Sequence, residues 1–207
     1  MAVIDHLVYA VPDLADGIAH FESILGVRAS MGGSHPGKGT HNALLSFGTS
    51  YLEIIAPDPD QPEPAEPRPF GVTVGMEPSL VTYAVRPAPG ETLESLVERS
   101  TAAGHDPGPI ASMSRAAPDG SELTWRLTFP TMAASGFVPF LIDWGDTRHP
   151  SESAPAGGQL LDLTGSIPDA DRANAVNTAL GVEVTASTGD AGLRALIRTI
   201  SDESITL

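Results

Sequence analysis

The chain of 207 residues contains no cysteine. Disulfide bridges, thiolate nucleophiles and cysteine-ligated zinc are therefore excluded together. The strong metal ligands that remain are histidine, aspartate and glutamate. Any metal chemistry of this protein must rest on these three residue types.

Basic residues are also scarce, because 11 Lys and Arg stand against 26 Asp and Glu, which gives a formal net charge of −15. Such a surface repels nucleic acid and anionic lipid, so we expect neither as a partner. The acidic residues are scattered along the chain and do not form a tail, which is typical of a well-solvated surface.

Long apolar runs are absent, and no stretch approaches the length that spans a membrane. The first residues form a predicted strand and carry neither a basic leader nor a cleavage site, so a cytoplasmic location is expected. The hydrophobic content of 41% is enough for a globular core.

The first 57 residues read as a strand, a helix and about three further strands. The helix follows Pro12, with Asp13 as its expected N-cap and Gly26 at its end. The extended segments "HNALLSFG" and "SYLEIIAP" follow, joined by a tight turn.

This pattern returns twice along the chain. The helix-ending glycines Gly26, Gly104 and Gly181 are separated by 78 and 77 residues, which indicates a repeat. We predict an α+β fold in which tandem βαβββ modules form an open curved-sheet barrel, followed by a partial third module. The predicted divisions are a first module at 1–57, a Pro-rich connector at 58–78, a second module at 79–150 and a partial βαββ(β) module at 157–207.

The first strand carries a histidine in an apolar setting. Strand alternation places His6 on one face with Ile4 and Val8, and Asp5 on the other. A buried imidazole needs a partner for each ring nitrogen, which a backbone carbonyl, a water or a metal ion could provide. For a lone histidine, a satisfied core residue is the usual interpretation.

The opening "IDHLVYAVPDL" and the later "YLEIIAPDP" together resemble the vicinal oxygen chelate superfamily, which includes glyoxalase I, extradiol dioxygenases, epimerases and bleomycin resistance proteins. The segments "SHPGKGTHNALLSFG", "WRLTFP" and "PFLIDWGDTRHP" are similar to its glyoxalase-like branch. The resemblance covers roughly the first 150 residues. It implies an open barrel in which the first strand of a module supplies a His ligand and the last a Glu ligand.

Carried onto this chain, the resemblance implies that His6 and Glu53 hold a divalent metal ion of unknown identity, with Glu53 also in a catalytic role. Alternation independently places Glu53 with Tyr51 and Ile55 on one face of an apolar strand, where an uncompensated carboxylate would be costly. A shared ion would explain both residues. Separate hydrogen bonds near the barrel mouth are the alternative.

The second half departs from the ligand pattern of the family. Leu80 aligns with His6, and Leu141 aligns with Glu53. Asp143 and His149 are the nearby candidates for further ligands. A site with two protein ligands holds a divalent ion weakly, so a protein without any metal is also considered.

Four further residues are candidates for substrate binding: His35, His41, Tyr51 and Trp144. His41 is expected to face the pocket together with Ala43, Leu45 and Phe47, whereas Asn42 is expected to point away and to fix the loop. Tyr51 and Trp144 are expected to form aromatic walls.

Two functions are consistent with these residues. The first is a small-molecule enzyme in which a divalent metal chelates neighbouring oxygens of a carbonyl or enediol substrate and promotes proton transfer, as an isomerase, epimerase, lyase or dioxygenase. The second is a metal-free small-molecule binding or antibiotic-resistance protein of the bleomycin-resistance type. The third module could cap the barrel or form a homodimer.

Overall fold

A computed structural model describes residues 1–116, 120, 122–129 and 137–207. Ten strands and helices make up the two predicted modules, and each module has the order βαβββ. The first comprises β1 (Ala2–Ala10), α1 (Leu14–Leu25), β2 (Ser30–His35), β3 (Thr40–Ser46) and β4 (Tyr51–Pro57). The second comprises β5 (Ser79–Pro87), α2 (Leu93–Ala102), β6 (Ile110–Ala116), β7 (Glu122–Thr128) and β8 (Phe140–Asp143).

The eight strands of the two modules form one sheet in the order β2-β3-β4-β1-β5-β8-β7-β6. The two halves of this sheet have the same strand order when each is read outward from the centre. In the first half β1 pairs in parallel with β4, and in the second half β5 pairs in parallel with β8. The two halves join through the antiparallel pair β1 and β5. The sheet curves until its edge strands β2 and β6 come into contact, which confirms the predicted open barrel.

The predicted ends of the first helix are confirmed. The side chain of Asp13 accepts a hydrogen bond from the backbone N–H of Asp16, and Gly26 ends α1 with a φ of 72°. Glycine adopts this left-handed conformation without the steric cost that a Cβ atom would add.

The chain then continues into a second, four-stranded sheet. It comprises β9 (Gln159–Ile167), α3 (Ala170–Leu180), β10 (Thr185–Thr188), β11 (Gly192–Arg198) and β12 (Ser204–Thr206). The strand order is β10-β9-β11-β12, so the strand before the helix pairs with the strand that directly follows it. In each of the first two modules, the strand before the helix pairs in parallel with the last strand of the module instead. The third segment therefore repeats the order of elements but not the strand pairing.

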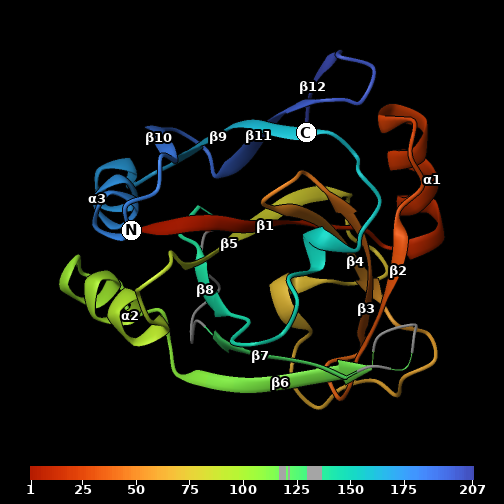
Figure 1. Ribbon diagram of the computed structural model, residues 1–207, viewed down its shortest axis with the longest axis horizontal. Helices are drawn as coiled ribbons and strands as arrows, with labels where there is room; N and C mark the ends of the chain where they lie inside the picture. The colour runs from red at the N-terminus through yellow and green to blue at the C-terminus, as the bar shows by residue number, and fades with distance from the viewer. Residues whose placement is uncertain (117–119, 121, 130–136) are drawn as a thin grey trace.

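Two cores lie on opposite faces of the large sheet. The outer core contains buried residues of α1, α2 and α3 together with those of the second sheet. Figure 1 shows β9 and β11 lying across β1 and β5. The hydroxyl of Tyr83 on β5 donates to Asn177 Oδ1 on α3 at 2.8 Å and ties the second sheet to the first.

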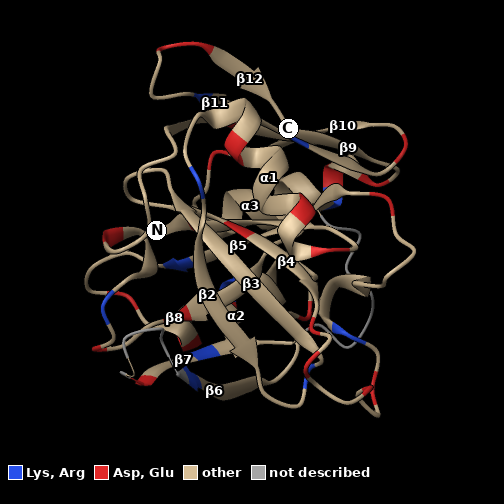
Figure 2. Cartoon of the chain, turned by 90° about the vertical axis from the view of Figure 1, so that its right-hand side faces the viewer, with Lys and Arg blue, Asp and Glu red and all other residues tan. Residues whose placement is uncertain are grey.

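The inner core lies on the concave face and contains mainly aromatic and aliphatic residues of β1, β4, β5, β7 and β8. Acidic positions are spread over several loops and helices, as the colours of Figure 2 show. None of the helices in the described ranges has the length and apolar character needed to cross a membrane.

Candidate active site in the concave face of the barrel

The concave face encloses a cavity of about 690 Å³, including the space at its mouth. Its walls are largely aromatic, through Tyr51, Phe70, Trp125, Phe129, Phe140 and Trp144. The other polar side chains that line it are His6, His35, Lys38, Asn42, Glu53, Arg115 and Thr128.

A β-bulge in β1 sets the geometry of the site. The pairing of β1 with β5 shifts register between Ile4 and His6, so Asp5 is the extra residue. Ile4 therefore packs against the outer core together with Leu7, and the predicted common face of Ile4 and His6 is wrong. The bulge brings Asp5 beside its neighbour His6.

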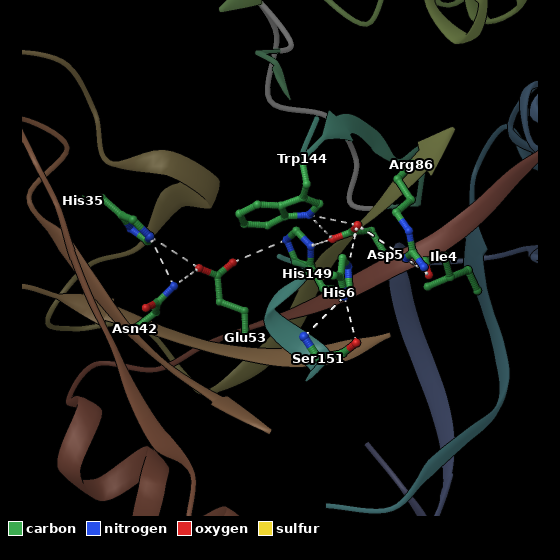
Figure 3. Close-up of polar contacts among 10 residues, drawn as sticks. All are labelled: Ile4, Asp5, His6, His35, Asn42, Glu53, Arg86, Trp144, His149 and Ser151. Carbon is green, nitrogen blue, oxygen red and sulfur yellow. Dashed lines mark hydrogen bonds and ion pairs between the residues drawn. The ribbon is translucent and has the colours of Figure 1, made fainter. Parts of the chain in front are cut away.

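Asp5 is fully buried and holds several side chains together (Figure 3). It accepts hydrogen bonds from His149 Nε2 at 3.0 Å and from Trp144 Nε1 at 3.1 Å, and Arg86 Nη1 lies 3.5 Å away. Burial alone would raise the pKa of Asp5, but the hydrogen bonds from His149 and His6 outweigh burial and hold this pKa well below its ordinary value. Asp5 is therefore a carboxylate at neutral pH.

Asp5 also fixes the imidazole of His6. The Nδ1 atom of His6 lies 2.6 Å from Asp5 Oδ1, so Nδ1 carries the hydrogen and Nε2 presents its lone pair. The ring stacks on Tyr51 with a centroid distance of 4.6 Å. A carboxylate on the far nitrogen is the usual support of a metal-binding histidine.

The Nε2 atom of His6 points towards Glu53, and its distance to Glu53 Oε2 is 3.6 Å. This separation exceeds a hydrogen bond. It is short enough for both atoms to ligate one ion with bonds of about 2.0 to 2.2 Å. His6 Nε2 and Glu53 Oε2 are therefore close enough to share an ion.

The other oxygen of Glu53 is held by Asn42. The Nδ2 atom of Asn42 donates to Glu53 Oε1 at 2.6 Å and lies 3.2 Å from His35 Nε2. The Nδ1 atom of His35 contacts Thr40 Oγ1 at 2.9 Å. Burial lowers the pKa of His35, which fits a neutral ring that donates from Nδ1 and accepts at Nε2. Figure 3 shows Glu53 between this pair and His6.

The structure brings five predicted site residues together on the cavity wall and places the other three elsewhere. His6, His35, Tyr51, Glu53 and Trp144 line the cavity. Of the remaining three, His149 reaches the site indirectly, since it binds Asp5 behind His6.

His41 does not line the cavity, whereas Asn42 does, so the predicted faces of β3 are reversed. The residues on the opposite face of β3 from Asn42, such as Ala43 and Leu45, belong to the outer core. Asn42 pairs with Ile55 across the sheet, and directly paired residues share a face. His41 instead lies near Asp58, with 3.9 Å between His41 Nδ1 and Asp58 Oδ1.

Asp143 also faces away from His6 and Glu53. Its Oδ2 accepts from Arg126 Nη2 at 2.8 Å, whereas its neighbours Ile142 and Trp144 line the cavity. In the described ranges, no three His, Asp or Glu side chains are arranged to hold one ion. Within these ranges, His6 Nε2 and Glu53 Oε2 are a pair close enough to share an ion, at 3.6 Å.

The strand register corrects the predicted alignment of the second half. Ala10 pairs with Ile55, and the corresponding Ala84 pairs with Phe140. The counterpart of Ile55 is thus Phe140, and Leu141 packs in the outer core and is not the counterpart of Glu53. Val138, two residues before Phe140, lies before β8 and is apolar, so the second half has no carboxylate at the equivalent position.

We expect Gly32→Ala to disturb Glu53 through Asn42. A Cβ atom at Gly32 would lie 2.1 Å from Asn42 Oδ1, so the amide that holds Glu53 must move. Unfolding titrations should show a loss of about 1 to 3 kcal/mol. Gly75→Ala is the control, since its Cβ would meet nothing within 4 Å. Equal stability of the two variants would contradict this role of Gly32.

Comparison with known proteins places the fold in a family. The family model described as "Glyoxalase-like domain" matches residues 4–181. No match was found among curated proteins.

Among solved structures, a hypothetical protein from Staphylococcus aureus aligns with a TM-score of 0.66 at 11% identity, over 100% of this chain and 98% of that one. The methylmalonyl-CoA epimerase of Mycobacterium tuberculosis aligns with a TM-score of 0.40 at 17% identity, over 67% of this chain and 84% of that one. A xylose isomerase-like TIM barrel/4-hydroxyphenylpyruvate dioxygenase fusion protein aligns with a TM-score of 0.43 at 17% identity, over 96% of this chain and 30% of that one.

Proposed function

We propose that this chain, which belongs to the glyoxalase-like domain family, is a small-molecule enzyme. It moves a proton at a carbon next to a carbonyl group. The observation that carries the proposal is the alignment of Asp5, His6 and Glu53. Asp5 fixes the tautomer of His6, and Nε2 then faces Glu53 Oε2 across 3.6 Å. A plain hydrogen-bonded pair would be closer.

The residues fit a divalent ion that is completed by water or substrate. His6 would hold it through Nε2 and Glu53 through Oε2, and the donor set admits manganese, iron, nickel, zinc or magnesium. Bound there, such an ion supplies Lewis-acid polarisation of two neighbouring substrate oxygens.

Glu53 is the proton acceptor in this proposal. In the described part of the chain it is the only carboxylate on the cavity wall. Its hydrogen bond from Asn42 fixes the carboxylate through Oε1 and orients Oε2 towards the cavity side of His6. Aromatic side chains line much of the cavity, and Glu53 is only 6% exposed, which limits the access of water to its carboxylate.

Metal retention tests the site. The untagged protein, stripped with a chelator and incubated with each of the five ions, should retain at least one of them by elemental analysis. His6→Ala should weaken retention at least about tenfold. His20→Ala, at an exposed histidine of α1, should leave it unchanged. Unaltered retention in His6→Ala would place the ion elsewhere.

A metal-free binding protein is the second candidate function. It is favoured by the aromatic walls together with the two-ligand limit within the described residues. Under this alternative, none of the five ions is retained by the wild-type protein, whereas a small apolar ligand still binds in the cavity.

A further inference from the structure

We propose that the cavity takes an anionic substrate, a carboxylic acid with an aromatic-sized apolar body, and that Arg115 binds its carboxylate. The proposal rests on the proposed function to the extent that this cavity is the substrate site. It adds a substrate class and a specificity-determining residue.

Arg115 is a buried cation on the cavity wall. Its side chain comes from β6 and is only 6% exposed. Its Nη1 donates a hydrogen bond to the carbonyl oxygen of Gly32 on β2, across the seam of the barrel. The guanidinium is therefore held in place, which lowers the entropic cost of binding a ligand.

Arg115 has no acidic partner in the part of the chain that the structure describes. No carboxylate there forms an ion pair with it within 4.0 Å, and Glu53, which lines the same cavity, attracts the guanidinium only from a longer distance. A buried charge is costly without a partner. A bound carboxylate would provide one, and the planar guanidinium can donate two parallel hydrogen bonds to it.

The sign of the cavity differs from that of the protein. Lys38 and Arg115 line the cavity against one carboxylate, Glu53, whereas the whole chain carries −15. Lys38 Nζ lies 5.0 Å from the ring centroid of Phe129 near this wall. A cationic cavity in an acidic protein selects anions from solution.

The walls indicate the rest of the ligand. Trp125 and Trp144 lie with ring centroids 5.4 Å apart, and Phe70 and Phe140 lie 5.3 Å apart. These surfaces stabilise a flat apolar group through burial and ring stacking. A small aromatic acid satisfies both the walls and Arg115.

Two matched probes test the proposal: mandelate, and its neutral amide mandelamide. The chain has two tryptophans and both line the cavity, so intrinsic fluorescence reports binding there. In chelator-treated wild-type protein, mandelate should bind about 10- to 100-fold more tightly than mandelamide. Equal affinity, including failure of both probes to bind, would overturn the proposal.

Variants separate a charge role from closure of the barrel. Arg115→Met should remove the preference for mandelate and leave the affinity for mandelamide, whereas Arg115→Lys should keep part of the preference. Arg126→Met is the control, since Arg126 pairs with Glu94 and Asp143. Equal loss of both probes in a folded Arg115→Met protein would make Arg115 purely structural and overturn the proposal.

The wild-type comparison of the two probes stands even where a variant fails to fold. The chelator also separates this proposal from the proposed function. Absence of any retained metal would reject the metal site and leave the anion preference intact, whereas equal probe affinities would reject only Arg115 as the anion site.

Discussion

Glu53→Gln is expected to slow proton exchange at a carbon next to a carbonyl by about 10²- to 10⁴-fold, the range of general acid and base catalysis. The amide has the shape of the carboxylate and can still accept from Asn42, which now donates to Glu53 Oε1 at 2.6 Å. It cannot accept a proton from carbon at neutral pH. The loss should therefore appear in the rate and not in the fold.

The measurement is deuterium incorporation into 2-hydroxyacetophenone, which carries two neighbouring oxygens and an aromatic body, followed by proton NMR in D₂O. Glu77→Gln is the matched control, because Glu77 is exposed and lies outside the cavity lining. Unfolding titrations should show that Glu53→Gln remains folded. Exchange at the wild-type rate in Glu53→Gln would contradict the assignment of Glu53 as the proton acceptor.

The sequence was sufficient for the features that depend on local patterns. Helix-ending glycines at nearly equal spacing predicted the recurring order of elements, and Asp13 and Gly26 predicted the ends of α1. The structure confirms both, although the third segment pairs its strands differently. The face of Glu53 was also predictable, since Tyr51 and Ile55, two residues to either side on a regular strand, share that face.

Prediction failed where regular alternation was an insufficient guide. The bulge at Asp5 interrupts the alternation of faces along β1. The side chains of Asp5 and His6 can therefore contact each other, whereas adjacent residues of a regular strand point to opposite faces. On β3, the more apolar face packs under the helix, which left the polar Asn42 for the cavity.

Other contacts depend on tertiary structure alone. Arg115 reaches Gly32 because the edge strands β2 and β6 approach, and His149 reaches Asp5 from a segment 144 positions along the chain. Neither contact follows from the periodicity of any element. The location of His6 and Glu53 on the cavity wall could therefore be anticipated, but the groups that support them could not.

Asp5→Asn should lower the free energy of unfolding by about 3 to 5 kcal/mol at pH 7, the cost of breaking a buried charged network. The amide nitrogen would face a donor, because His6, His149 and Trp144 all present N–H groups to this side chain. Arg86, 3.5 Å from the carboxylate, would lose its anionic partner. Chemical denaturation measures the loss.

The pH dependence of stability gives a second test of the same residue. The pKa of Asp5 in the folded protein lies below its ordinary value of 3.8. The carboxylate therefore stabilises the fold fully above about pH 4, and this contribution is lost as the pH falls towards the lower folded pKa. Asp5→Asn should lack this part of the acid-induced loss. Asp162→Asn, at an exposed aspartate of β9, should change stability by less than about 0.5 kcal/mol and keep the wild-type profile. A similarly small effect of Asp5→Asn would show that the four groups around Asp5 do not depend on its charge.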